Sequence, residues 1–464
     1  MNTNTKKKKK KKKNKNNKNN KKEKKEKKEK MIKLIKELIE KHNNKVPLND
    51  IPINKTIETN SWFDLKESDK FIFDNKLKFK EQIYKNKIIK CNKVILQPTD
   101  EQQKILLNWL NANRIMYNET VKFIKNKYWN DKILQTNFIS LRKIKILKEK
   151  KNKLKTKYNT YTHILDSAIK LASVSFKSAL TNLKNGNIKH FNIRYLKKNK
   201  PTHIMDIEQS FLNKEKSFCY KKLGSELLNK NNIKYNEIKN DCKIHYCRLN
   251  NRFTLLVPME LDKLEKLENE QDKLEKNNYM SIDPGVRTFL TGLCNDKKFE
   301  ICTNSYKEIK NILQKIDKLK LIKFKNLKKK KNKLRLKLKN KITDLHWKSI
   351  NYLIKQNKNT IIIGRWSTKS CISNNNKKQL NPMLKRVCSS LRYYDFLQKL
   401  KYKSHFNNIT LKIQDESFTS IMCSTCGIIN ENLGSSKIFN CLNCKSTYDR
   451  DMNACRNILI KSLN

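Results

Sequence analysis

The sequence is poor in glycine, proline and long apolar runs. It contains 7 Gly and 7 Pro in 464 residues, whereas ordinary usage is about 7% and about 5%. This scarcity predicts long helices and few tight turns. No apolar run approaches the ~18 residues of a membrane-spanning helix, and the N-terminus lacks the apolar core of a signal peptide. We therefore expect a soluble, intracellular protein.

Acidic residues are also scarce, because 43 Asp plus Glu stand against 106 Lys plus Arg, which gives a formal net charge of +63. Phosphates that pair with such cations release counterions, so this balance favours nucleic acid as the partner. An anionic membrane surface is the weaker alternative. The 13 Cys, an odd number in a chain without a secretion signal, indicate reduced thiols and leave room for a metal site.

Changes in composition divide the chain into segments. Residues 1–30 hold no apolar residue beyond the first and predict a disordered Lys/Asn-rich tail, either a nuclear-localisation or nucleic-acid-binding segment or a merely solvated one. Residues 31–84 are a poorly defined extension that opens with a short amphipathic helix, and residues 261–278 are a charged helical linker. Residues 85–260 begin with a strand, continue with helices and end in short strands, whereas 279–464 alternate strands with helices, as in an α/β sheet.

Several elements can be placed from periodicity and end signals. A strand over 88–96 precedes a helix whose start is predicted by a capping box, with Thr99 as N-cap and Gln102 three residues on. Residues 384–404 predict one continuous helix. The other expected elements are a helix over 160–184, helical sequence over 306–358, a hairpin over 279–294, strands over 243–249, 252–261, 359–364 and 408–414, and a C-terminal helix with its acids at the start.

Two cysteine pairs carry the most specific signal. They are Cys423, Cys426, Cys441 and Cys444, each pair with CxxC spacing. Two such knuckles can place four thiolates in a tetrahedron suited to zinc with no position left open. We therefore expect one structural Zn2+ per chain, in a ribbon over about residues 417–447. The alternatives are four unrelated thiols or a redox pair.

Three acids occupy places where an open α/β sheet presents its active groups, beyond the carboxyl ends of strands. Asp283 ends a strand in SIDPG, Glu416 follows the strand expected at 408–414, and Asp451 begins the last helix. Converging carboxylates raise one another's pKa, but they can bind two Mg2+ ions about 3.5–4 Å apart, which activate water and stabilise the leaving oxygen of a phosphodiester. The pattern therefore predicts a metal-dependent nuclease.

Each acid also has an ordinary structural interpretation. Asp283 could belong to an Asp-Pro-Gly turn, Glu416 could be a surface charge, and Asp451 could be a helix N-cap. Asp415 and Asp449 are alternative candidates for the two later positions.

Together these motifs resemble the RuvC-like nuclease of the transposon-encoded TnpB proteins and their eukaryotic and viral relatives, the Fanzors. The first RuvC motif is similar to SIDPGVRTF, the third to DRDMNACRNI, and the entry into the family's zinc ribbon to ESFTSIMCSTCG. The family's N-terminal segment is similar to LQPTDEQQKILLNWLNANRIMYNE.

One departure from the family pattern concerns the second RuvC motif. Most TnpB proteins carry a Glu at the end of a central strand, where NTIIIG places Gly364. Fanzor-like members have Gly there and a Glu just before the zinc ribbon, at the point that Glu416 occupies. The resemblance therefore implies a catalytic, Mg2+-binding triad of Asp283, Glu416 and Asp451.

The resemblance covers about residues 88–464. It implies an α/β, RNase H-like (RuvC) nuclease domain with an inserted four-cysteine zinc ribbon, preceded by a wedge-like β-barrel with a helical recognition region. It also implies an RNA-guided, Mg2+-dependent DNA endonuclease of a mobile element, with a guide RNA derived from that element. The location would be the nucleus, the cytoplasm or a viral factory.

Two other functions stay open. The first is a catalytically inactive DNA- or RNA-binding regulator of transposition, which Gly364 favours because an acid is missing there. The second is a DDE-type transposase, which is less favoured because its acids need no zinc ribbon between the second and the third.

Overall fold

The computed structural model describes most of the chain beyond its N-terminal region. The described residues are 26, 29–40, 53, 55–59, 62–68, 88–131, 134–212, 218–224, 227–261, 278–294, 297–319, 327–372, 380–434 and 436–463. The predictions of a disordered tail at 1–30 and a helical linker at 261–278 fall almost wholly outside them. The chain forms two compact units, one of residues 1–86 with 263–464 and one of residues 87–262.

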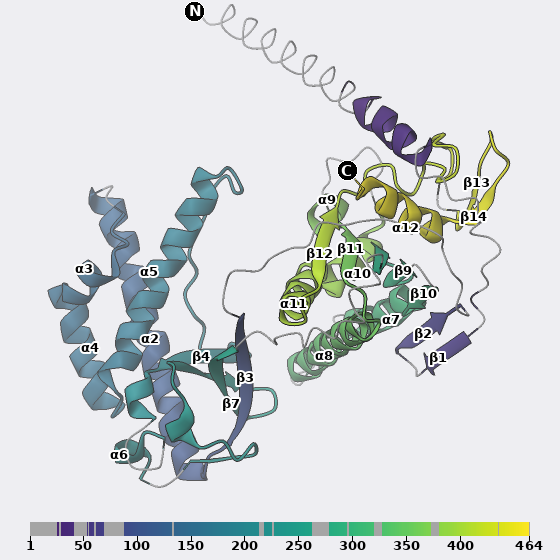
Figure 1. Cartoon of the computed structure of the whole chain (residues 1–464). Helices are drawn as coiled ribbons and strands as arrows, with labels where there is room; N and C mark the ends of the chain where they lie inside the picture. The colour runs from purple at the N-terminus through teal and green to yellow at the C-terminus, as the bar shows by residue number, and fades with distance from the viewer. Residues whose placement is uncertain are drawn as a thin grey trace, which may run out of the picture. The chain divides into compact units, whose positions relative to one another are not determined.

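A seven-stranded mixed sheet forms the centre of the first unit, in the order β1-β2-β10-β9-β8-β11-β12 (Figure 1). Its strands are β1 (Lys55–Thr59), β2 (Asp64–Glu67), β8 (Tyr279–Pro284), β9 (Leu290–Cys294), β10 (Lys298–Ile301), β11 (Thr360–Gly364) and β12 (Thr410–Gln414). β11 pairs parallel with both β8 and β12, and the other ladders are antiparallel. The expected hairpin at 279–294 is confirmed, as are the strands expected at 359–364 and 408–414.

Helices pack on both faces of this sheet. They are α7 (Ser305–Lys318), α8 (Leu327–Lys355), α9 (Thr368–Ile372), α10 (Pro382–Leu391), α11 (Tyr393–Phe406) and α12 (Arg450–Lys461). Side chains of β11 alternate between the two layers, as the strand repeat requires. Ile361 and Ile363 join the main core with α7, α8, α10 and α11, whereas Ile362 packs with Ile458 and Leu459 of α12.

The helix expected at 384–404 is two helices, so that prediction was wrong. Arg392 has the left-handed backbone φ 51°, ψ 47° between α10 and α11, a conformation that periodicity does not reveal in a non-glycine residue. Arg392 forms an ion pair with Asp395 one turn later. The break puts Tyr393 at the start of α11, where its hydroxyl donates to the Gly364 carbonyl at 2.9 Å.

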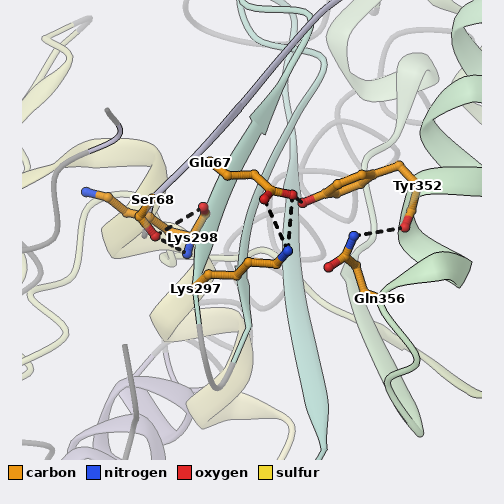
Figure 2. Close-up of polar contacts among 6 residues, drawn as sticks. All are labelled: Glu67, Ser68, Lys297, Lys298, Tyr352 and Gln356. Carbon is orange, nitrogen blue, oxygen red and sulfur yellow. Dashed lines mark hydrogen bonds and ion pairs between the residues drawn. The ribbon is translucent and has the colours of Figure 1, made fainter. Parts of the chain in front are cut away.

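Strand β2, from the extension whose pattern was poorly defined, is fastened into the sheet by a buried polar cluster (Figure 2). Lys297 Nζ lies 3.2 Å from both carboxylate oxygens of Glu67, and the Tyr352 hydroxyl donates to the same carboxylate. The Lys298 amide donates to Ser68 Oγ at 3.0 Å. Because Glu67 is only 7% exposed, its charge requires these partners.

The helix over residues 29–40 confirms the short amphipathic helix expected at the start of the extension. Its Ile35 and Ile39 are buried in one cluster with Met422 and Ile460. This helix therefore packs on the segment that carries the first cysteine pair and on the end of α12.

The second unit joins a five-stranded antiparallel sheet to a group of helices. The strands are β3 (Ile88–Gln97), β4 (Thr202–Ile207), β5 (Leu228–Asn229), β6 (Cys242–Cys247) and β7 (Arg252–Leu261), in the order β4-β6-β7-β3-β5. The helices are α2 (Asp100–Asp131), α3 (Phe138–Lys143), α4 (Lys145–Lys157), α5 (Thr162–Lys184) and α6 (Tyr220–Leu223), with 3-10 turns η2 (Gln209–Phe211) and η3 (Tyr235–Glu237). Across the described residues no ladder joins β4 to β5, so a closed barrel stays a prediction.

The long helix α2 begins with the predicted capping box. The Thr99 amide donates to Gln102 Oε1 at 3.1 Å, and the Gln102 amide donates to Thr99 Oγ1 at 3.3 Å. The N-terminal part of α2 packs on the sheet through Leu106 and Trp109, and its later turns pack on α3, α4 and α5.

Candidate active site and metal centre

The three predicted acids lie on the first unit, on elements that meet at one edge of its sheet. Asp283 is near the carboxyl end of β8, and Glu416 follows the carboxyl end of β12 by two residues. Both strands run parallel to β11, so their carboxyl ends share an edge. α12, which carries Asp451 in its first turn, packs beside β8 and β9, and its Cys455 donates to the Thr291 carbonyl at 3.1 Å.

Asp283 is a strand residue and not a turn residue. It pairs with Thr291 in the ladder between β8 and β9. The turn follows it, with the Gly285 amide donating to the Phe289 carbonyl at 3.0 Å. Burial, then the charges of Glu416 and Asp451, raise the pKa of Asp283 well above its ordinary value. Asp283 is therefore electrostatically coupled to both other acids.

Glu416 fills the space that a side chain at position 364 would need. A Cβ built on Gly364 would lie 2.3 Å from Glu416 Oε1 and 2.7 Å from its Cγ. The same Oε1 is buried, and among the described residues it has no hydrogen-bond partner. Burial, then the charge of Asp415, raise the pKa of Glu416 to about 7. These contacts contradict the interpretation of Glu416 as a surface charge.

Asp451 is free of the capping role that its position allowed. The N-cap of α12 is Asp449, whose carboxylate accepts from the amides of Asp451 at 2.9 Å and Met452 at 3.0 Å. Burial and the charge of Asp449 raise the pKa of Asp451, against a smaller opposite effect of Arg450. A half-buried acid that does not cap its helix has a carboxylate available for a ligand.

The neighbouring Asp415 has a structural role instead. Its carboxylate accepts from the Ser417 amide at 2.9 Å and lies 3.4 Å from Lys461 Nζ. Although burial raises the pKa of Asp415, the hydrogen bonds from Ser417 and the charge of Lys461 leave it lowered. Asp415 and Asp449 thus stabilise the backbone on which Glu416 and Asp451 are carried.

Lys461 fixes the loop that carries Glu416, a role that the sequence did not indicate. Its Nζ donates to the carbonyls of Asp415 at 2.8 Å and Ser417 at 3.0 Å, on either side of Glu416. The side chain is buried although it lies in the last turn of α12. A lysine at a helix end ordinarily indicates a solvated charge, and these contacts join residues about 45 positions apart in the chain.

The three carboxylates fit a divalent cation by their chemistry. Hard oxygen ligands suit Mg2+, and one of these oxygens is buried without a partner among the described residues. Within the described part of the chain, however, only the four cysteines form a group of three or more ligands with all ligand atoms within 4.8 Å of one another. The three carboxylates therefore do not all lie within that distance of one another.

The four cysteines converge as their spacing predicted. The Sγ atoms of Cys423 and Cys444 lie 3.6 Å apart, and those of Cys426 and Cys441 lie 3.5 Å apart. Four sulfurs at about 2.3 Å from one zinc ion would be separated by about 3.8 Å, so the cluster can hold a metal such as zinc with little movement.

Backbone hydrogen bonds build the two cysteine knuckles. The Gly427 amide donates to the Cys423 carbonyl at 2.9 Å, and the Cys441 amide donates to the Ser446 carbonyl at 2.9 Å. The second pair lies between β13 (Ile438–Asn440) and β14 (Thr447–Asp449), which pair antiparallel. The Nδ2 atoms of Asn453 and Asn457 in α12 both donate to the Met422 carbonyl at 2.7 Å. The cysteine segment is therefore fastened to the helix that carries Asp451.

Comparisons with known proteins show which family this chain is similar to. Residues 393–458 match the family described as Cas12f1-like, TNB domain. TnpB-like protein R854 of Acanthamoeba polyphaga mimivirus is 32% identical over 87% of this chain and 82% of its own length. TnpB-like protein L770 of the same virus is 32% identical over 87% and 83%. Putative transposase A625R of Paramecium bursaria Chlorella virus 1 is 26% identical over 83% and 89%.

Two solved structures match most of this chain, with low TM-scores. A Cas12f1–sgRNA–target DNA complex matches 80% of this chain and 98% of its own, with 16% identity and a TM-score of 0.31. The mini-RNA-guided endonuclease CRISPR-Cas_phi3 matches 82% and 93%, with 10% identity and a TM-score of 0.44. At these TM-scores neither likeness supports a conclusion about the present site. Of the helices described, none is long and apolar enough to cross a membrane.

Proposed function

This chain belongs to the TnpB-like protein family, and we propose that it is an RNA-guided, Mg2+-dependent DNA endonuclease of a mobile element. Asp283, Glu416 and Asp451 are the catalytic carboxylates and the ligands of two Mg2+ ions. Cys423, Cys426, Cys441 and Cys444 hold one structural Zn2+. The first unit is a RuvC-like nuclease, and the second is the wedge and recognition region that binds nucleic acid.

The observation that carries this proposal is the contact between Glu416 and Gly364. An acid is absent from the end of the central strand β11, but the Glu416 carboxylate lies over the Gly364 backbone, at the place that a side chain there would occupy. Glycine is thus what makes room for the acid from the loop. This contact supports the nuclease over the catalytically inactive regulator that Gly364 favoured.

The surroundings of the three acids suit metal-dependent hydrolysis of a phosphodiester. When bound, Mg2+ would lower the pKa of water and stabilise the charge that develops on the leaving oxygen. The charges of Glu416 and Asp451 both raise the pKa of Asp283, so a cation that offsets either charge would lower that pKa. Lys461 and the Asp449 cap hold Glu416 and Asp451 in place without using those carboxylates.

The proposal of a guide RNA and a DNA target is supported by membership of the family and by the net charge of +63. Base pairing with a guide would read the target, while the lysine-rich surface would hold the backbone of the duplex. A location in the nucleus, the cytoplasm or a viral factory goes with that proposal. RNA that copurifies with the chain, expressed with its native downstream flank, would be sequenced to obtain the guide.

The test is cleavage of a DNA matched to that guide by variants that exchange one carboxylate for an amide. Asp283→Asn, Glu416→Gln and Asp451→Asn should each lower the cleavage rate by at least about 100-fold, since each removes a metal ligand. The matched controls Asp415→Asn and Asp449→Asn should cleave within a few-fold of wild type, because Asn can still accept the same amide hydrogen bonds. Wild-type rates in the first group would refute the triad.

A further inference from the structure

A cavity of about 620 Å3 in the second unit has no part in the proposed chemistry. It lies at the start of α5, beside the end of β4, and its other walls include residues of α3, η2 and α6. In a chain with a net charge of +63, its lining combines stacked rings with four acidic and four basic side chains.

Three aromatic rings form one wall of the cavity. Tyr161 and His163 stack with centroids 5.5 Å apart, and Phe211 lies 4.4 Å from Tyr161 and 4.3 Å from His163. Trp109 packs edge-on against Tyr161 at 5.3 Å, so the wall is supported from the core. Aromatic walls of this kind favour flat rings such as nucleobases.

His163 and Thr160 line this cavity and carry buried polar atoms that have no partner among the described residues. His163 is 8% exposed, and among the described residues neither of its ring nitrogens has a hydrogen-bond partner. Burial lowers the pKa of His163 to about 4, so the ring is neutral and offers one donor and one acceptor. Thr160 Oγ1 is also buried without a partner in that part of the chain. Unpaired buried groups cost about 1–3 kcal/mol each.

Four acidic side chains line the cavity, and their charge disfavours the phosphate of a nucleotide and favours the amino group of a base. They are Asp166, Asp206, Glu208 and Asp241. Asp166 is engaged by Lys151 at 2.8 Å, and Asp206 by Lys243 at 2.6 Å. The Glu208 carboxylate has no hydrogen bond or ion pair with any described residue, and burial, then Asp241, raise its pKa. Carboxylates repel phosphate but accept from the amino groups of adenine, cytosine and guanine.

Basic side chains also line the cavity. Lys222 Nζ lies 4.9 Å above the Tyr161 ring and donates to Asn159 Oδ1 at 2.8 Å. α5, a helix of 23 residues, begins here with Tyr161 as an N-cap that makes no side-chain capping bond. Its first amides and the lysine together favour an anion such as a phosphate.

We propose that this cavity binds a single unpaired nucleobase that carries an amino group. The base would lie against Tyr161 and Phe211 with its amino group toward Glu208, and its phosphate would lie at Lys222 and the start of α5. A base turned out of a duplex, or one in a single strand, can present itself in this way. The site does not depend on cleavage, so it stands or falls separately from the carboxylate triad.

The test uses the full chain without Mg2+ and the free 5′-monophosphate of 2-aminopurine riboside, whose fluorescence falls on stacking. AMP, CMP and GMP should displace it at least about tenfold more effectively than UMP, which has no amino group. Deoxynucleotides are measured in parallel, because the base could come from RNA or from DNA. If a deoxynucleotide displaces the probe as well as the matching ribonucleotide, the cavity binds the base of either nucleic acid. If it displaces the probe less well, the cavity is specific for RNA. Equal displacement by all bases, including UMP, would show phosphate binding alone and overturn the proposal.

Variants locate the binding in the cavity. Glu208→Gln should reduce the preference for amino-bearing bases about tenfold, and this side chain is exposed, so folding is not at risk. Phe211→Leu should weaken binding of every base. The matched control is Tyr195→Leu, because Tyr195 also has a lysine, Lys125, 4.9 Å above its ring but does not line the cavity. An equal loss in the Tyr195 variant would place the binding elsewhere.

Discussion

The cysteine cluster and the carboxylate cluster are both sets of metal-type ligands, but the fold assembles them in opposite ways. The four thiols come from residues 423–444, and local backbone hydrogen bonds shape both knuckles around them. The carboxylates come from β8, a loop after β12 and the first turn of α12, and each has a raised pKa. The cysteine cluster, once it binds its metal, stabilises the segment around it. The carboxylate cluster is instead held in place by the surrounding strands and helix.

The difference also explains what could be read from the sequence. CxxC spacing determines the geometry of the thiols, so all four were predicted and do converge. Asp283, Glu416 and Asp451 were placed on the correct elements, because strands and a capped helix start leave signals in the sequence. Their support could not be predicted, since Lys461 and Tyr393 act through contacts between distant residues. The strand β2 was missed for the same reason: its fixing partners, Lys297 and Tyr352, lie more than 200 residues away.

The largest expected effect is loss of the cysteine cluster. Cys441→Ser should abolish the one zinc per chain and disorder the segment around it, because zinc binding contributes about 10–16 kcal/mol to the folding of small zinc domains. Cleavage should fall as well, since Asn453 and Asn457 fasten this segment to the helix of Asp451. Zinc content and thermal unfolding measure both. The control is Cys91→Ser, an exposed thiol outside the cluster; equal zinc in both variants would argue against the site.

The second largest effect is expected for a substitution at Gly364, which should lower DNA cleavage while leaving the stability of the protein almost unchanged. Gly364→Ala should lower cleavage by about 100-fold or more, because the new Cβ requires the space of the Glu416 carboxylate. Stability should change by less than about 1 kcal/mol, since the obstructing atoms belong to the end of a flexible side chain that can turn away.

A double variant provides the stricter version of this experiment. Gly364→Glu combined with Glu416→Ala returns the acid to the end of β11, and it should cleave at least about tenfold faster than Gly364→Ala. Both rates are measured on the guide-matched DNA. If Gly364→Ala cleaves like wild type, Glu416 does not act from the position described.

The third effect is a pH dependence of stability in the metal-free chain. The pKa of Glu416 rises from its ordinary value of 4.5 to about 7 on folding, so the folded state binds the proton more tightly than the unfolded state. This contribution is complete below about pH 4.5 and is lost as the pH rises through about 7. In EDTA the chain should therefore lose on the order of 1–3 kcal/mol between pH 5 and pH 8 from this group. Denaturant unfolding of wild type and Glu416→Gln measures it; an identical pH slope in both would exclude Glu416 as the source.

The smallest effect distinguishes two acids that lie two residues apart. Asp449→Ala should cost about 1 kcal/mol of stability, because the amides of Asp451 and Met452 lose their acceptor. Asp449→Ser should recover most of that loss, since Ser also caps helices, while either change lowers the pKa of Asp451 by removing a neighbouring negative charge. Cleavage should stay within a few-fold of wild type in both variants, in contrast to Asp451→Asn. If Asp449→Ser instead abolishes cleavage while the stability of the variant is unchanged, the catalytic carboxylate is that of Asp449. Asp449 would then both cap α12 and act in the reaction.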